Sequence, residues 1–67
     1  MNSVLLGEYQ KKSGKTKTHL AKAISVSRPT IYKIFANPSI ATYGQAEKLS
    51  EELGIDTKED RENIFLP

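Results

Sequence analysis

The side chains most able to do chemistry in this 67-residue sequence are its lysines and arginines, which are unevenly distributed. Residues 1–36 hold seven of the ten basic residues and one acid, a net charge of +6, whereas residues 37–67 hold three basic and seven acidic residues, a net charge of −4. Such a split indicates a polyanionic partner for the first half, although charge that only keeps helices soluble would give the same pattern. The seven basic residues are Lys11, Lys12, Lys15, Lys17, Lys22, Arg28 and Lys33.

The residue sets that catalysis and metal binding need are missing from the sequence. It has no cysteine and a single histidine, His19, so neither a cysteine-based zinc site nor a histidine pair can be assembled. No nucleophile–base pair and no glycine-rich phosphate loop is evident. We therefore expect no enzymatic activity, no metal, no cofactor and no small-molecule ligand. His19 is expected to be a surface residue or a neighbour of a phosphate.

The sequence also bears on location. No apolar stretch approaches the ~20 residues that a membrane span needs. The run Val4-Leu5-Leu6 is too short for the core of a signal peptide. The absence of cysteine permits a reducing compartment. We expect a cytoplasmic protein without a membrane partner.

Apolar residues recur at helical spacing along the chain, and no segment alternates apolar and polar residues for long. The pattern predicts one all-α domain over residues 1–67. Gly14 and Gly54 are expected as left-handed helix stops, and Thr42 with Gln45 as a capping box. The five predicted helices cover residues 3–13, 17–24, 28–36, 43–53 and 57–64.

Residues 17–36, KTHLAKAISVSRPTIYKIFA, predict two short helices joined by a sharp turn. Ala21 is small where the second of these helices must cross closely, and Val26 is an apolar plug just after the turn. Two helices that meet at about 90–120° through such a turn form the helix-turn-helix unit. Its second helix can fit a DNA major groove about 12 Å wide. Four apolar residues are expected to anchor the pair inward: Leu20, Ile24, Ile31 and Ile34.

This segment resembles the helix-turn-helix of the Cro/lambda-repressor-like (Xre) regulators. The resemblance is carried by Leu20-Ala21, Ile24-Ser25-Val26, Ile31 and Ile34, and the five-helix pattern extends it over nearly the whole chain. It implies a lambda-repressor-like all-α fold and is greatest to small phage or prophage regulators of the Cro type, which act in the bacterial host cell. The sequence departs from the family at Ser25, where glycine is usual because the turn often needs a positive φ.

The outward residues of the third predicted helix are the expected base-reading residues, as the resemblance also implies. The guanidinium of Arg28 can donate to O6 and N7 of one guanine. Lys33 can reach a base or a phosphate, and Tyr32 can contact a thymine methyl group or donate to a phosphate. The alternatives are that Tyr32 is a partly buried aromatic residue and Lys33 an ordinary surface residue. The base-reading set is Arg28, Pro29, Tyr32 and Lys33.

Phosphate contacts are expected on both sides of that helix. Lys17 and Thr18 begin the second helix, whose backbone N–H groups favour an anion. Ser27 and Thr30 flank the start of the third helix, and Asn37 follows its end. Such contacts set the register of a protein on DNA and carry no sequence preference. The alternative for Ser27 is that it is only a helix cap.

These features predict a sequence-specific transcriptional repressor that reads operator half-sites in double-stranded DNA. Because one helix reads few bases, we expect a homodimer, formed in solution or only on DNA, on half-sites about 34 Å apart. Phe65 and Leu66 are either core residues or a dimer contact. The alternative function is a protein-binding module on the same fold, of the antirepressor or antitoxin type, that uses its acidic fourth and fifth helices.

Overall fold

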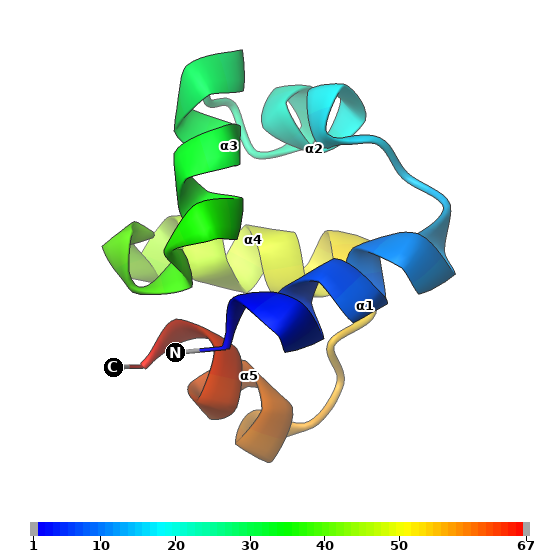
Figure 1. Cartoon of the computed structure of the whole chain (residues 1–67), viewed down its shortest axis with the longest axis vertical. Helices are drawn as coiled ribbons and strands as arrows, with labels where there is room; N and C mark the ends of the chain where they lie inside the picture. The colour runs from blue at the N-terminus through cyan, green and yellow to red at the C-terminus, as the bar shows by residue number, and fades with distance from the viewer. Residues whose placement is uncertain (1, 67) are drawn as a thin grey trace.

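The computed structural model describes residues 2–66, which form five α-helices and one short 3-10 helix and contain no strand (Figure 1). The predicted all-α architecture with five helices is confirmed. The elements are α1 (Ser3–Ser13), α2 (Lys17–Ala23), α3 (Arg28–Ala36), η1 (Pro38–Ile40), α4 (Tyr43–Leu53) and α5 (Lys58–Phe65).

Helices α1, α3 and α4 have the predicted bounds because capping residues mark their ends. The Asn2 side chain accepts the Leu5 N–H and starts α1, and Gly14 ends α1 with a φ of 71°. Thr42 and Gln45 form the predicted capping box at the start of α4. Each of these caps satisfies backbone groups that a helix end leaves unpaired.

The other two helices differ slightly from the prediction. Helix α2 ends at Ala23, one residue early, because Ile24 has left the helical conformation with a φ of −102° and a ψ of 8°. Helix α5 begins one residue late, because Thr57 is its N-cap and accepts the Asp60 N–H. It continues one residue further than predicted, to Phe65.

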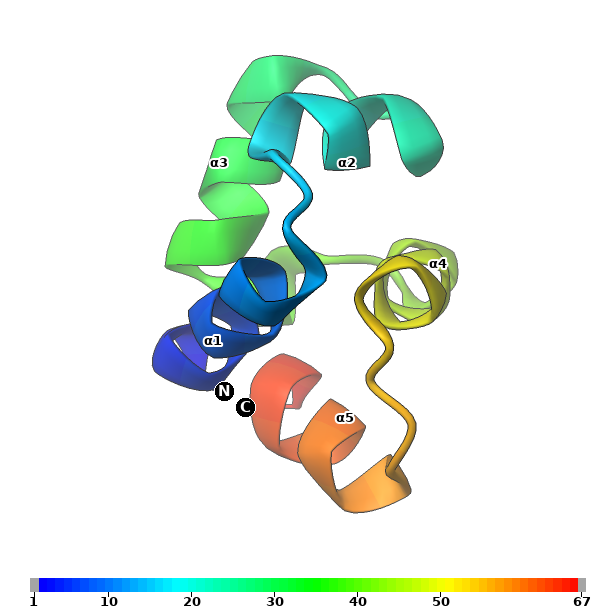
Figure 2. The same ribbon diagram turned by 90° about the vertical axis from the view of Figure 1, so that its right-hand side faces the viewer.

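The helices are arranged so that the helix-turn-helix pair and α5 lie at opposite ends of the molecule. In Figures 1 and 2, α1 and α4 lie between α2 at one end and α5 at the other, and α3 runs along the side. The helix-turn-helix pair, whose helices carry four basic residues and no acidic one, therefore forms one end of the protein. Helix α5, with three acidic and two basic residues, forms the other.

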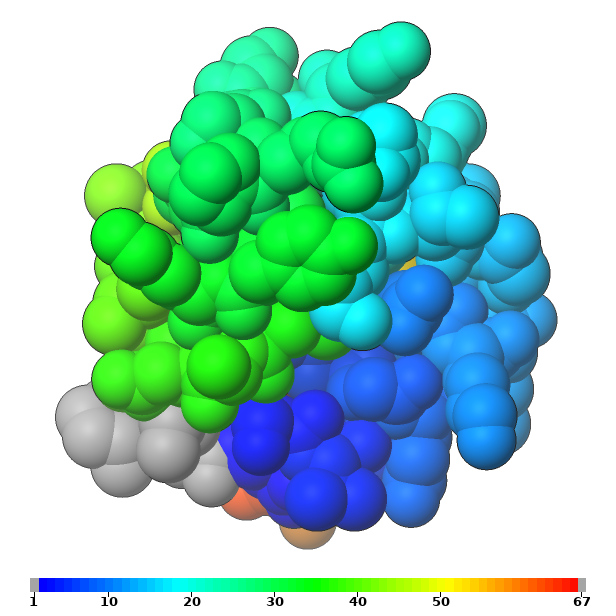
Figure 3. Space-filling view, turned by 45° about the horizontal axis from the view of Figure 1, so that its top comes forward, coloured from blue at the N-terminus to red at the C-terminus, as the bar shows by residue number. Residues whose placement is uncertain are grey.

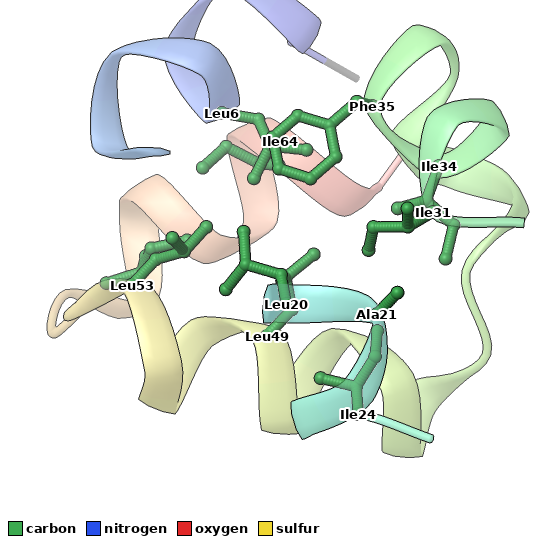
Figure 4. Packing of buried hydrophobic residues seen from close by; sticks show 11 residues of the cluster. Leu6, Leu20, Ala21, Ile24, Ile31, Ile34, Phe35, Leu49, Leu53 and Ile64 are labelled. Carbon is green, nitrogen blue, oxygen red and sulfur yellow. The ribbon is translucent and has the colours of Figure 1, made fainter. Parts of the chain in front are cut away.

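Side chains from all five helices meet in one hydrophobic core (Figure 4). Ile55, between α4 and α5, is buried there as well, and Phe65 is half-buried against the core. Leu66 is 54% exposed, so of the two C-terminal apolar residues Phe65 is the one that contributes to the core. Six core side chains have essentially no contact with solvent: Leu6, Leu20, Ile31, Ile34, Leu49 and Ile64.

Helix α5 is tied to α1 by polar contacts as well. The Asn2 N–H donates to the Ile64 carbonyl at 3.2 Å. The Tyr9 hydroxyl donates to the Asp60 carboxylate, and this hydrogen bond, with lesser contributions from burial and acidic neighbours, raises the pKa of Tyr9 to about 12. These contacts join the beginning of the described chain to its end.

Candidate nucleic-acid interface

The turn between α2 and α3 has the backbone geometry that the sequence predicts. Ser25 has a φ of 61° and is the one non-glycine residue with a positive φ among those described. The Val26 N–H donates to the Ala21 carbonyl at 2.9 Å and the Ser25 N–H to the Lys22 carbonyl at 3.2 Å. Because this conformation costs an L-residue about 1–2 kcal/mol, the packing of the two helices must offset it.

That packing buries one face of each helix of the pair. Leu20 and Ala21 of α2 are 0% and 2% exposed, and Ile31 and Ile34 of α3 are 0% and 1% exposed. Ile24, at the end of α2, is also buried, and Val26 packs partly against the same core. With these residues inward, the opposite face of α3 must lie at the surface.

The predicted base-reading residues lie on that surface. Figure 3 shows α3 and α2 side by side on one face of the molecule. Tyr32 is half exposed, so its side chain is partly covered, as in the alternative of a partly buried aromatic residue, and is also accessible from solvent. Within residues 2–66, no carboxylate forms an ion pair with Arg28 or Lys33, and both charges therefore face solvent. All four predicted base-reading residues are exposed: Arg28, Pro29, Tyr32 and Lys33.

Ser27 and Thr30 form a local cap at the start of α3. Ser27 Oγ accepts the Thr30 N–H at 3.4 Å, and the two hydroxyl oxygens are 2.8 Å apart. Pro29 fits this first turn because no intrahelical partner is lost with its missing N–H. The capping role of Ser27 is therefore confirmed, and it places Arg28 in the first turn of α3, at its exposed tip.

The remaining predicted phosphate contacts lie at two other places on the same pair of helices. Lys17 and Thr18 are half-buried in the first turn of α2, which Thr16 caps by accepting the His19 N–H at 3.1 Å. Asn37 is exposed just after α3, where its side-chain oxygen accepts a hydrogen bond from Ser39.

A contact between Lys17 and α3 is the main feature that the sequence does not predict. The ammonium nitrogen lies 4.9 Å from the centre of the Phe35 ring and 5.7 Å from the centre of the Tyr32 ring. A cation over aromatic faces at this range is attracted by about 0.5–1 kcal/mol at an exposed site. The spacing of Tyr32 and Phe35 on one side of a helix is visible in the sequence, but the path of the Lys17 side chain is not.

Comparison with known proteins agrees with this geometry. A family model described as helix-turn-helix matches residues 7–59, most of the chain. The chain belongs to the Xre helix-turn-helix family. It is therefore a DNA-binding helix-turn-helix protein with a lambda-repressor-like all-α fold. Searches of the curated proteins and of the solved structures gave no significant match.

The family model matches the helix-turn-helix but not the end of α5. The match includes all of α2, α3 and α4 and stops at residue 59, near the start of α5. Ser25, where the sequence departs from the usual glycine of the family, lies inside the matched residues. Its positive φ shows that the turn is formed despite the serine.

Two further features concern other classes of function. In residues 2–66, no group of three or more acidic or histidine side chains is placed to hold a metal ion. His19 is exposed on α2, as expected of a surface residue. None of the described helices has the length and apolar composition needed to cross a bilayer.

A shallow groove lies between α4 and α5, away from the helix-turn-helix. It has a volume of about 400 Å³. Its apolar lining includes Tyr43, which is 82% exposed, together with Phe65 and Leu66. Two acids and two bases complete the lining: Glu47, Lys58, Arg61 and Glu62.

Proposed function

We propose that this protein is a sequence-specific transcriptional repressor that occupies operator half-sites by inserting α3 into the major groove. One observation carries the proposal: the outer face of α3 is exposed and basic, while its inner face is fixed by the core. Its charges are also free of carboxylate partners within residues 2–66. A helix held in this way can enter a groove without rearranging the fold.

The base-reading role belongs to four residues in this proposal. Arg28 donates to a guanine, Pro29 packs at the tip, and Lys33 reaches a base or phosphate one turn later. Tyr32 contacts a thymine methyl group or donates its hydroxyl to a phosphate. Their common exposure on one helix face supports this assignment.

The phosphate-binding role belongs to residues around that face. Lys17 and Thr18 would contact one stretch of backbone and Asn37 another, and their places at the start of α2 and the end of α3 support a grip on both sides. Ser27 and Thr30 would add hydroxyl contacts beside Arg28. These contacts would set the register of α3 without reading the sequence.

We propose further that the repressor acts as a homodimer through the groove between α4 and α5. A two-fold axis brings the same surface of each copy together, so such an interface must be complementary to itself. The groove satisfies this requirement because its apolar part is bordered by both signs of charge. A second copy could then place Glu47 and Glu62 of one chain near Lys58 and Arg61 of the other.

Sedimentation equilibrium tests the dimer, both free and with an operator duplex. The expected result is a dimer at high concentration or two chains on each duplex. Tyr43→Ser should weaken it, whereas Val4→Ser, which removes an apolar side chain that is 71% exposed outside the groove, should not. A monomer at high concentration with one chain per operator would remove the dimer from the proposal.

The resemblance to Cro-type regulators supports a single-domain phage or prophage repressor acting on DNA in the bacterial cytoplasm. The alternative is a protein-binding module, and the acidic residues of α4 and α5 are the feature that would serve it. If uncharged residues replace the basic residues of α3 and activity in cells is unchanged, the protein-binding alternative would be favoured.

Selection of duplexes from a random-sequence pool tests the proposed function. The protein should enrich a near-palindromic sequence with half-sites about 34 Å apart or a multiple of that. Arg28→Ala should relax preference at one position of each half-site, whereas Lys48→Ala, which removes an exposed charge from α4, should leave the selected sequence unchanged. Failure to enrich any sequence would contradict sequence-specific repression.

A further inference from the structure

We propose that Tyr32 is a positioning residue for DNA binding, whose ring, together with that of Phe35, holds the Lys17 ammonium group ready for a phosphate. The inference rests on the proposed function and adds to it a contact between the two helices of the pair. The observation is the placement of one ammonium nitrogen 5.7 Å and 4.9 Å from the centres of the two rings.

The two rings are well placed to define where this cation lies. Tyr32 and Phe35 are three residues apart on α3 and therefore lie on the same side of the helix. Phe35 is 8% exposed and packed in the core, so its ring is fixed, whereas Tyr32 is half exposed at the outer edge. Lys17, the first residue of α2, thus lies over a platform that extends from the core to the surface.

The platform attracts the ammonium group without neutralising it. Within residues 2–66, Lys17 forms no ion pair with a carboxylate. An aromatic face draws a cation by its quadrupole and leaves the positive charge in place. The charge of Lys17 therefore remains available to a phosphate. A carboxylate partner would have reduced its attraction for that phosphate.

The expected benefit of this contact is that the Lys17 side chain is ordered before the protein binds DNA. A free lysine side chain has many conformations, and fixing it at an interface opposes association. A lysine already held against two rings loses less freedom when it meets a phosphate. From the usual cost of immobilising a long side chain at an interface, the Tyr32 ring should improve the dissociation constant by about two- to five-fold.

The test separates the ring of Tyr32 from its hydroxyl group by comparing Tyr32→Leu with Tyr32→Phe. Both variants lose the hydroxyl, but only Tyr32→Phe keeps the aromatic face. Because Tyr32 is half exposed, neither change removes a core side chain. Dissociation constants are measured on a selected operator duplex with Lys17 present, and again with Lys17→Gln.

With Lys17 present, Tyr32→Leu should bind about two- to five-fold more weakly than Tyr32→Phe. With Lys17→Gln, the difference between the two variants should become smaller by this factor, because the ring has no cation to hold and only its contact with the DNA remains. The matched control is Lys22→Gln, at an exposed lysine of α2 with no ring contact in the described part of the chain, and here the difference should persist. A difference that is as large with Lys17→Gln as with Lys17 present would overturn the inference and leave the proposed function standing.

A measurement on the free protein tests the contact without DNA. Ring currents should move the NMR resonances of the Lys17 ε-protons upfield of those of Lys22, and Tyr32→Leu should reduce that shift. Equal shifts for the two lysines would overturn the inference. Failure of the unsubstituted protein to bind any duplex would instead contradict the proposed function, and this inference with it.

Discussion

Ser25 shows how one residue can depart from a family pattern without changing the fold. The turn of the helix-turn-helix often needs a left-handed residue at this position, and the chain adopts a φ of 61° there despite the serine side chain. The neighbouring hydrogen bonds from Ser25 and Val26 back to α2 are formed. Ser25 is exposed, so its side chain meets no packing obstacle and the strain is confined to the backbone.

Ser25→Gly should therefore stabilise the protein. Glycine accepts a positive φ without the steric cost, and part of this gain is offset by its greater freedom in the unfolded chain. We expect an increase of about 0.4–1 kcal/mol in the free energy of unfolding, measured by thermal or urea denaturation. Ser25→Ala is the control and should give no increase, because alanine keeps the strain. A lower melting temperature for Ser25→Gly would contradict this view of the turn.

Arg28 and Lys17 should have different effects on DNA recognition. Arg28→Ala should cost about 1–3 kcal/mol on the selected operator and relax preference at one base pair. Lys17→Ala should weaken binding to operator and random duplexes by similar factors, because a phosphate contact carries no sequence information. Affinities of both variants for the two duplexes provide the measurement. Equal losses on both duplexes for Arg28→Ala would show that Arg28 does not read a base.

The exposure of individual site residues could be predicted, but their side-chain contacts could not. Helical spacing is enough to place Ile31 and Ile34 inward and Arg28 and Lys33 outward. The contact of Lys17 with its aromatic platform depends on one rotamer of a flexible side chain and on how closely α2 approaches α3. Neither quantity is encoded in a periodic pattern.

Helix bounds were predictable where a cap or a glycine marks them, as in α1 and α4. The structure of the segments between helices was less predictable. Pro38–Ile40 forms a 3-10 helix in which Pro38 is fully buried, and Ile55 joins the core from the α4–α5 connection. Both depend on contacts between distant parts of the chain, which apolar spacing within one helix does not report.

The connection from α1 to α2 is fixed by a lysine that reaches the end of α4. Lys15 Nζ donates to Glu52 Oε2 at 2.9 Å and to the Glu52 carbonyl oxygen at 2.8 Å. The hydrogen bond and the charge of Lys15 lower the pKa of the Glu52 carboxyl group. One side chain thus holds the connection before the helix-turn-helix against the rest of the fold.

Lys15→Met should lower the melting temperature at neutral pH by a few degrees, because both contacts are lost. Glu52 has a lower pKa in the folded than in the unfolded chain, so its contribution is complete above the ordinary glutamate value of 4.5 and is lost as pH falls through the folded value. The difference between the two proteins should therefore narrow under acidic conditions. Melting curves across this pH range provide the measurement.

Lys58→Met is the matched control for that variant. Lys58 is 89% exposed and its nitrogen is 4.0 Å from Glu62, a pair that solvent screens strongly. Its removal should leave the melting temperature nearly unchanged. If Lys15→Met behaves like Lys58→Met, the Lys15 contact does not stabilise the connection.

Charge is uneven along the molecule, because α2 and α3 carry four basic residues and no acidic one, whereas α5 carries three acidic and two basic residues. Helices α2 and α3 lie at one end and α5 at the other (Figures 1 and 2). The small net charge of the whole chain, +2, is therefore lower than that of α2 and α3 together, which is +4. Such a field would orient the protein as it approaches a polyanion, with α2 and α3 toward the polyanion.

The dependence of DNA binding on salt should report this arrangement. If the bound unit contacts about four to six phosphates, a plot of log K against log salt concentration should have a slope of about −4 to −5. Lys17→Gln should reduce the slope by about 1. Titrations of a fluorescent duplex at several salt concentrations provide the slope. A slope near zero would show that the basic face does not meet the phosphates.

The most direct test of the account is to map the protein surface that meets DNA. Isotope-labelled protein is titrated with the selected operator duplex, and the change in each backbone NMR resonance is recorded. The largest changes should occur in α3 from Arg28 to Lys33 and at the start of α2, with little change in α5. Changes confined to the groove between α4 and α5, or none at all, would contradict the insertion of α3 into the duplex.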